Sequence, residues 1–195
     1  MDTHLLSRRA FLASATTATV VAAGCCTSGA KMNTAQVVPR KLSPNGRMNI
    51  ASIGCGGMGA GDIMSCHKEA DKVNVVALCD VDWERAAETF YKIPNAKQYK
   101  DYRKMLEEMD SQIDAVVVST PDHTHAPAAY MAMTMGKHAR VQKPLTHTIA
   151  EARLLAKVAK ETGVVTAMGN QGHSGNGVRE LCEMLWAGAI GDVKE

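Results

Sequence analysis

The sequence predicts an α/β fold in which helices cover both faces of a doubly wound parallel sheet. From residue 48 onward, short apolar runs alternate with helical segments, which is the pattern of parallel strands joined by helical crossovers. The glycine-rich sequence GCGGMG follows the first apolar run directly, at residues 54–59, and the second run ends at Asp80. A glycine turn after the first strand and an acid after the second favour a sheet that binds a dinucleotide at its carboxyl edge.

The first three strands are expected at residues 48–53, 73–78 and 115–119. Each is a short apolar run, and the third, AVVVS, is rich in β-branched residues. Helices are expected at residues 58–70, 83–92 and 102–109, the last of them short and of mixed charge.

The second half of the sheet is expected from strands at residues 137–142 and 164–168. Helices are expected at residues 125–135, 148–162 and 178–187. The helix at 148–162 has the clearest ends, because Thr148 and Glu151 form a capping box and Gly163 supplies a C-terminal stop. These elements complete the alternation that predicts the parallel sheet.

Charge and composition exclude several classes of function. The net charge of +2 divides into +5 for residues 1–47 and −3 for residues 48–195. The body of the protein therefore lacks the basic surface that a nucleic-acid-binding domain needs. Aromatic residues make up only 4%, which disfavours stacking platforms for single strands. The six cysteines have no metal-ligand spacing, so no metal site is expected.

The N-terminus is typical of an export signal. Residues 7–12, SRRAFL, resemble a twin-arginine translocation signal, and an uncharged, modestly apolar run follows. Small residues before Cys25 form a weak lipobox; ordinary cleavage near Ala23 is the alternative. We therefore expect a signal at residues 1–26, a linker at 27–47, and a periplasmic or lipid-anchored protein at the cell envelope.

The glycine turn predicts a phosphate site. In the spacing G-x-G-x-x-G, Gly54 permits a tight turn, Gly56 lets the backbone approach a pyrophosphate, and Gly59 allows the next helix to pack against the strand. The N-terminus of that helix then offers free N–H groups to the phosphates. A purely structural glycine turn is the alternative interpretation.

Asp80 bears on the choice of cofactor. A carboxylate at the end of the second strand accepts the ribose hydroxyls of NAD and repels the 2′-phosphate of NADP. No arginine follows Asp80 immediately, although Arg85 is near in sequence. We therefore expect NAD rather than NADP.

Two further strand ends carry chemistry-bearing residues, because carboxyl ends of strands face the ligand crevice of such sheets. The third strand ends in Ser119, Thr120 and Pro121, followed by His123 and His125. The two histidines lack a Glu or Cys partner at ligand spacing, so a cofactor contact is favoured over a metal.

The fourth expected strand ends in Gln142 and Lys143. An ammonium group at Lys143 can polarise a substrate hydroxyl or carbonyl and assist proton transfer. A solvated surface charge is the alternative.

These motifs together resemble the glucose–fructose oxidoreductase / inositol dehydrogenase (Gfo/Idh/MocA) family. The resemblance covers residues 48–195 and includes residues 54–59, Asp80, Thr120-Pro121 with His125, Lys143-Pro144 and the run AGAIG at 187–191. It implies an NAD(P)-binding Rossmann domain at 48–170, with residues 171–195 beginning the connection to a second α/β domain that binds substrate. Residues 169–174 resemble the exported branch of the family.

The resemblance also implies roles for single residues. Lys143 is the lysine of the family's Glu-Lys-Pro motif, but the preceding position is Gln142 here, so a charge beside Lys143 is lost. The expected catalytic residues are Lys143 and His173, although a structural role for His173 is an equal alternative. The expected cofactor-binding residues are Gly54, Gly56, Gly57, Met58, Gly59, Asp80, Ser119, Thr120, Pro121, His123, His125, Gln142, Lys143 and Asn170.

The resemblance implies a longer enzyme, so we expect this chain to be C-terminally truncated, with the substrate domain missing. The expected function is hydride transfer between NAD and a hydroxyl of a sugar, polyol or glycoside. The alternatives are an NAD-dependent glycosidase without net redox change and a non-catalytic nucleotide- or sugar-binding lipoprotein. The expected partner is a small carbohydrate, and no nucleic acid is expected to bind. Contact with a membrane is expected only through a lipid on Cys25, and the full-length enzyme is a possible homo-oligomer.

Overall fold

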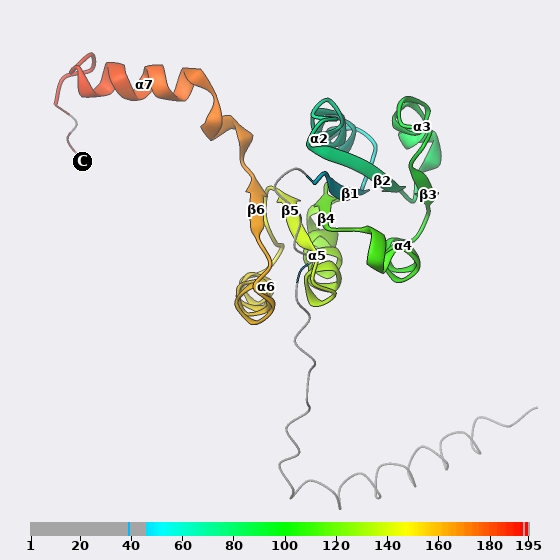
Figure 1. Cartoon of the computed structure of the whole chain (residues 1–195). Helices are drawn as coiled ribbons and strands as arrows, with labels where there is room; N and C mark the ends of the chain where they lie inside the picture. The colour runs from blue at the N-terminus through cyan, green and yellow to red at the C-terminus, as the bar shows by residue number, and fades with distance from the viewer. Residues whose placement is uncertain (1–38, 40–45, 193, 195) are drawn as a thin grey trace, which may run out of the picture. The chain divides into compact units, whose positions relative to one another are not determined.

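Six parallel strands form one sheet in the order β3–β2–β1–β4–β5–β6 (Figure 1). The strands are β1 (Met48–Ile53), β2 (Val73–Cys79), β3 (Lys97–Tyr99), β4 (Ala115–Val118), β5 (His138–Gln142) and β6 (Thr166–Gly169). The strand order reverses between β1 and β4, which is the doubly wound arrangement of a Rossmann sheet. The predicted fold class is confirmed.

The computed structural model describes residues 39, 46–192 and 194. The export signal expected at residues 1–26, the lipobox at Cys25 and most of the linker expected at 27–47 lie outside the described residues. Within them, no helix combines the length and the apolar character needed to cross a membrane.

Helices cover both faces of the sheet. They are α2 (Met58–His67), α3 (Trp83–Lys92), α4 (Tyr102–Glu108), α5 (His125–Thr134) and α6 (Ile149–Thr162). The chain also forms a further helix, α7 (Asn176–Trp186), and 3₁₀ turns η1 (Asp110–Gln112), η2 (Asp122–Thr124) and η3 (Gln171–Ser174). Figure 1 shows α2 and α3 over one face and α4, α5 and α6 over the other. Side chains that point to either face of the central strands are therefore covered by helices.

Two apolar clusters form the core, one on each face. Neighbouring residues of β1 divide between them: Ile50 joins the cluster with Ile63 of α2, and Ala51 joins the cluster with Ala129 of α5. Such a division follows from the period of two along a strand. Because β1 is buried on both faces, its apolar residues do not alternate strictly with polar ones.

The strand register aligns the carboxyl ends of the central strands. Ile53 at the end of β1 is opposite Cys79 at the end of β2 and opposite Val118 at the end of β4. Farther along the same edge, Gln142 of β5 is opposite Gly169 of β6. The segments that follow these strands consequently emerge at one edge of the sheet.

Side chains fix several helix ends. Asp82 and Asp101 accept the backbone N–H groups of Arg85 and Arg103 at the starts of α3 and α4. The capping box predicted at Thr148 is present, and the predicted stop at Gly163 has a left-handed backbone with φ 69°. These local signals account for the accurate boundaries of α6.

The structure differs from the sequence prediction at β3 and at a few element ends. β3 has three residues and none of them is buried, so it lacks the apolar run that marks the other strands. The helix expected to continue to residue 70 ends at His67, and α7 begins two residues before its expected start at 178. The last strand is shifted by two residues at its start, to Thr166.

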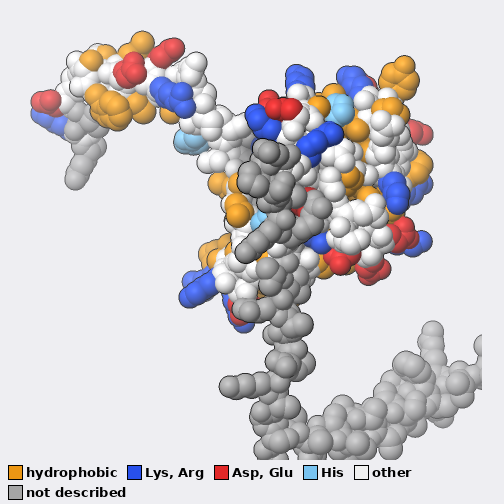
Figure 2. Space-filling view, in the orientation of Figure 1, with side chains coloured by type: hydrophobic (Ala, Val, Ile, Leu, Met, Phe, Trp, Pro, Cys, Tyr) orange, Lys and Arg blue, Asp and Glu red, His pale blue; other side chains and the backbone are white. Residues whose placement is uncertain are grey.

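The helix α7 exposes an apolar side of its own. None of its residues is buried, and Leu181, Met184 and Trp186 are all exposed. Figure 2 shows hydrophobic side chains gathered along this helix. The sequence pattern of an amphipathic helix is therefore present here.

Candidate dinucleotide site

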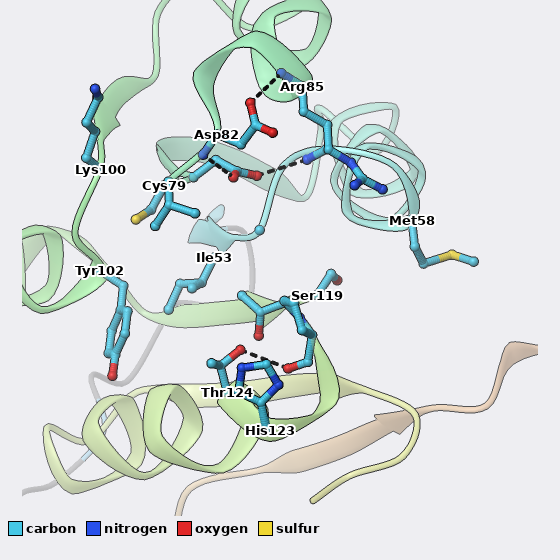
Figure 3. A pocket seen from close by; sticks show the side chains of 16 residues that line it. Ile53, Met58, Cys79, Asp82, Arg85, Lys100, Tyr102, Ser119, His123 and Thr124 are labelled. Atoms are coloured by element: carbon cyan, nitrogen blue, oxygen red, sulfur yellow. Dashed lines mark hydrogen bonds between the residues drawn. The ribbon is translucent and has the colours of Figure 1, made fainter. Parts of the chain in front are cut away.

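A cavity of about 580 Å³ opens at the carboxyl ends of β1, β2 and β4 (Figure 3). Its lining comes from the glycine turn after β1, the segment from the end of β2 into α3, the start of α4, and the segment after β4. Its volume lies within the ordinary range for small-molecule sites. The sheet reverses its strand order at this place, which is where ligands bind in open α/β sheets.

The glycine turn is held tightly between β1 and β4. Gly54 has φ +86°, and its N–H donates to the Cys79 carbonyl at 2.8 Å. A Cβ on Gly54 would lie 2.6 Å from the Ser119 carbonyl oxygen. A Cβ on Gly59 would lie 2.1 Å from the Gly54 carbonyl oxygen. Side chains at these two positions would collide with backbone atoms, so the turn requires glycine at both.

The start of α2 is open to a ligand. Gly57 precedes the helix, and no side chain caps it there. The first N–H groups of a helix have no intrahelical partners, and they favour an anion. Arg85 of α3 extends along the same turn, because a Cβ on Gly56 would lie 2.7 Å from its Cγ atom. The start of α2 therefore offers backbone N–H groups with one guanidinium nearby.

Asp80 is bound to the glycine turn. Its Oδ2 atom accepts the backbone N–H groups of Cys55 at 2.6 Å and Gly56 at 3.1 Å. Its Oδ1 atom accepts the backbone N–H of Asp82 at 3.0 Å. A carboxylate accepts about four hydrogen bonds, so Asp80 is fixed in direction and keeps acceptor capacity toward the cavity that it lines.

Two buried thiols lie beneath this turn. Cys55 and Cys79 are 0% and 3% exposed, and the Cys55 thiol donates to the Cys79 carbonyl. Burial raises the pKa of each thiol to about 12. Both are therefore neutral at ordinary pH and add no negative charge beneath a phosphate site.

The segment after β4 supplies the opposite wall. Ser119, Thr120, Pro121 and His123 line the cavity, as Figure 3 shows for Ser119 and His123. Among the described residues, the buried Thr120 Oγ1 atom has no hydrogen-bond partner. A buried hydroxyl without a partner is costly unless a ligand supplies one. The glycine cradle, the uncapped helix, the fixed carboxylate and this hydroxyl together fit a bound dinucleotide.

His125 lies behind this wall instead of lining the cavity. It is 1% exposed, and its ring nitrogens are each 2.7 Å from a backbone carbonyl oxygen, Nδ1 from Pro144 and Nε2 from Thr120. His125 thereby joins the segments that follow β4 and β5. Its expected contact with a cofactor stays a prediction.

The remaining expected residues lie along the same sheet edge, outside the cavity lining. Gln142 is buried at the end of β5, and Lys143 is exposed directly after it, with a cis peptide bond to Pro144. Asn170 follows β6, and His173 lies in η3; both are exposed. Gly57 and Gly59 also lie outside the lining, within the glycine turn. The roles expected for these residues stay predictions.

Sequence reasoning missed part of the lining. Lys100 and Tyr102 line the cavity from the junction of β3 and α4. Lys100 was missed because β3 was not predicted, and Tyr102 was predicted only as the first residue of a helix. Thr89 was also missed: its hydroxyl donates to the Cys55 carbonyl at 2.7 Å and anchors the turn to α3. The available signal for Thr89 was a small polar residue on the same side of the helix as the apolar residues Ala86 and Phe90.

Comparison with known proteins agrees with this geometry. Residues 48–170 match the Gfo/Idh/MocA family, described as an oxidoreductase family with an NAD-binding Rossmann fold. A glycosyl hydrolase family 109 protein of Shewanella pealeana is 31% identical over 96% of this chain and 44% of its own length. Inositol 2-dehydrogenase 2 of Saccharopolyspora erythraea is 35% identical over 60% of this chain and 33% of its own.

Solved structures show the same fold. The structure of GenD2 from gentamicin A biosynthesis, in complex with NAD, is 29% identical and superposes with a TM-score of 0.59 over 67% of this chain and 36% of its own. The chain thus spans less than half the length of these relatives. The predicted family and NAD as its cofactor are confirmed, and the chain belongs to the Gfo/Idh/MocA family of NAD-binding oxidoreductases.

Proposed function

We propose that the chain is the cofactor-binding part of an enzyme that transfers hydride between NAD and a hydroxyl of a sugar, polyol or glycoside. The observation that carries the proposal is the fixed Asp80 carboxylate beside the uncapped start of α2, in one cavity at the switch point of the sheet. Relatives named inositol 2-dehydrogenase and a solved structure bound to NADH and a UDP-sugar acid support this substrate class.

Each wall of the cavity has a part in binding. The acceptor position of Asp80 that the backbone leaves open takes a ribose hydroxyl, and the N–H groups at the start of α2 take the pyrophosphate. The unpartnered Thr120 hydroxyl gains a hydrogen bond from the bound cofactor. When bound, NAD supplies a hydride acceptor, which this chain's side chains lack.

Lys143 is the proposed group for proton handling. In its amine form Lys143 takes up the hydroxyl proton as the carbon is oxidised, and the ammonium group that results passes the proton on to water. In the reverse direction it stabilises the carbonyl oxygen on which negative charge develops. His173 is proposed as a substrate contact, because η3 follows the β6 strand end at the same sheet edge.

A glycosidase that uses NAD without net redox change is the second candidate. Two Shewanella relatives, the glycosyl hydrolase family 109 protein and an alpha-N-acetylgalactosaminidase, match 96% and 97% of this chain at 31% and 30% identity. Matches to the dehydrogenases cover a smaller share of the chain. Oxidation at a sugar carbon is common to both candidates, so the same cavity serves either.

One experiment separates the candidates. The full-length enzyme is incubated with NAD and panels of free sugars, polyols and nitrophenyl glycosides, and NADH and aglycone release are followed together. Net NADH from a free sugar or polyol supports the dehydrogenase, and aglycone release without net NADH supports the glycosidase. Neither product, together with tight NAD binding, would favour the non-catalytic binding protein.

Export is a separate part of the proposal. The twin arginines Arg8 and Arg9 and the uncharged run after them support transport by the twin-arginine route to the periplasm or cell envelope, with Cys25 as the candidate lipid site. Replacing both arginines with lysine should retain the protein in the cytoplasm in a fractionation assay. If Cys25 carries a lipid, replacing it with serine should move the protein from the membrane fraction to the soluble fraction.

Self-association of the full-length enzyme is proposed as well, and size-exclusion chromatography tests it.

A further inference from the structure

A buried carboxylate on α2 lies outside the lining of the cavity but is bonded to residues at the ends of two strands. Asp62 is 9% exposed, although aspartate is a poor residue for the interior of a helix. Its Oδ2 atom accepts the Ser119 hydroxyl and the Gln142 Nε2 amide group, each at 2.8 Å. Its Oδ1 atom lies 3.2 Å from the Arg140 guanidinium. A buried charge that is so fully paired has a defined position.

Asp62 fixes the direction of the Gln142 side chain. A glutamine amide has one donor end and one acceptor end, whereas an ionised carboxylate only accepts. Because Nε2 donates to Asp62, Oε1 faces the other way and accepts the backbone N–H of Lys143 at 3.0 Å. The hydrogen bonds thus run from α2 to the peptide group at which Lys143 leaves β5.

Space around the amide is limited on the side of β6. A Cβ on Gly169 would lie 2.7 Å from Gln142 Oε1 and 2.8 Å from its Cδ atom. Gly169 is the register partner of Gln142, so the amide fills the place where a side chain would otherwise stand. The amide therefore has both its orientation and its location determined by neighbours.

We propose that Asp62 is a positioning residue for Lys143: it orients the Gln142 amide, which holds the Lys143 backbone N–H and sets the direction in which Lys143 leaves the strand. This inference rests on the proposed function, in which Lys143 handles the substrate proton. It also accounts for glutamine at residue 142. A glutamate there would place two carboxylates at hydrogen-bond distance in a buried site, where like charges repel.

A swap of the two groups tests the proposal. Asp62→Asn and Gln142→Glu each break the carboxylate–amide pair, whereas the double variant restores it with the carboxylate on residue 142. Exchange of the Lys143 backbone N–H with solvent, measured by NMR on the chain, reports the hydrogen bond without any activity assay. We expect each single variant to speed this exchange about tenfold, as for the loss of one hydrogen bond, and the double variant to restore it.

Two controls separate positioning from general destabilisation. Asp110→Asn removes the ion pair of Asp110 with Lys137, just before β5, and should leave exchange at Lys143 unchanged. The Val141 N–H, one residue before Gln142, serves as an internal reference. Equal acceleration at Val141 and Lys143 in Asp62→Asn, or unchanged exchange at Lys143, would overturn the proposal.

Kinetics of the full-length enzyme give the second readout. Asp62→Asn should lower kcat about tenfold while the KM for NAD changes less than about twofold, and the double variant should recover kcat. A double variant that stays as slow as the single ones contradicts a positioning role. If Lys143→Ala turns over normally, the proposed function fails, whereas the exchange result at Lys143 still decides the role of Asp62 independently.

Discussion

The carboxylate of Asp80 accepts the backbone N–H of Cys55 at 2.6 Å, which joins the end of β2 to the glycine turn. The residue expected to select the cofactor therefore also holds the turn that is expected to bind its phosphates. If Asp80 accepts a ribose hydroxyl, ribose binding and order in the turn depend on the same side chain. A substitution at Asp80 should consequently affect both affinity and stability.

Asp80→Ala should weaken NAD binding by about tenfold or more. A hydrogen bond to a charged group contributes about 1.5–3 kcal/mol, and this variant loses the one to ribose. NADP should lose much less, because the carboxylate that repels its 2′-phosphate is gone and Arg85 stays along the turn. Calorimetric titrations of the wild-type protein and the variant with both nucleotides give the loss of affinity for each. Equal losses for NAD and NADP would mean that Asp80 does not contact the ribose.

Two glycines of α2 should respond oppositely to alanine. Gly59→Ala should destabilise the fold by about 3 kcal/mol or more, because its Cβ would lie 2.1 Å from the Gly54 carbonyl oxygen. Gly61→Ala should stabilise the fold by about 0.5–1 kcal/mol, because a Cβ on Gly61 would meet no other atom within 4 Å and alanine favours the helix. Urea unfolding measures both. A Gly59→Ala protein of normal stability would show that the helix packs less closely than described.

The buried thiols should be unreactive and should make stability depend on alkaline pH. With the pKa of Cys55 and Cys79 raised from 9.0 to about 12 by burial, neither forms a thiolate near pH 8. Iodoacetamide labelling with peptide mapping should modify the partly exposed Cys182 and leave both buried thiols intact.

The sign of the pH effect follows from the same values. Between pH 9 and 12 the unfolded chain loses thiol protons that the folded chain keeps, so the free energy of unfolding should fall as pH rises through this range. Cys55→Ala and Cys79→Ala should each flatten that decline. A slope that neither variant changes would rule out these thiols as its source.

The capping box of α6 provides a stability change remote from the cavity. Thr148→Ala should cost about 1 kcal/mol, with NAD affinity unchanged. Hydrogen bonds from the Thr148 and His147 backbones hold the pKa of Glu151 below its ordinary value. The Glu151 contribution is therefore present above pH 4.5 and is lost as pH falls below it. Urea unfolding at neutral and acid pH checks both parts, and altered NAD affinity would contradict the separation.

The central strands could be predicted because they are buried on both faces. The AVVV run of β4 and the mostly apolar run of β1 are unambiguous for that reason. β3 could not be predicted, since Lys97 and Gln98 are exposed and only pairing with β2 makes the segment a strand. The cavity residue Lys100 was lost with it.

The site itself was predictable where a local motif determines it. The glycine spacing and Asp80 are of this kind, and they line one cavity together. Asp62 is not, because its partners Ser119 and Gln142 are 57 and 80 residues away. Asp62 lies in the interior of a helix, where aspartate is unfavourable, but the sequence spacing could not predict which residues would bond to it.

Titration of the protein with NAD in a calorimeter measures cofactor binding itself. We expect one NAD per chain, weaker binding of NADP, and a thermal stabilisation that corresponds to about 2.7 kcal/mol when NAD is at about 100 times its Kd. In Asp80→Ala, the preference for NAD over NADP should be lost. No heat of binding and no shift in Tm with NAD, for a folded protein, would rule out NAD as the ligand of this cavity.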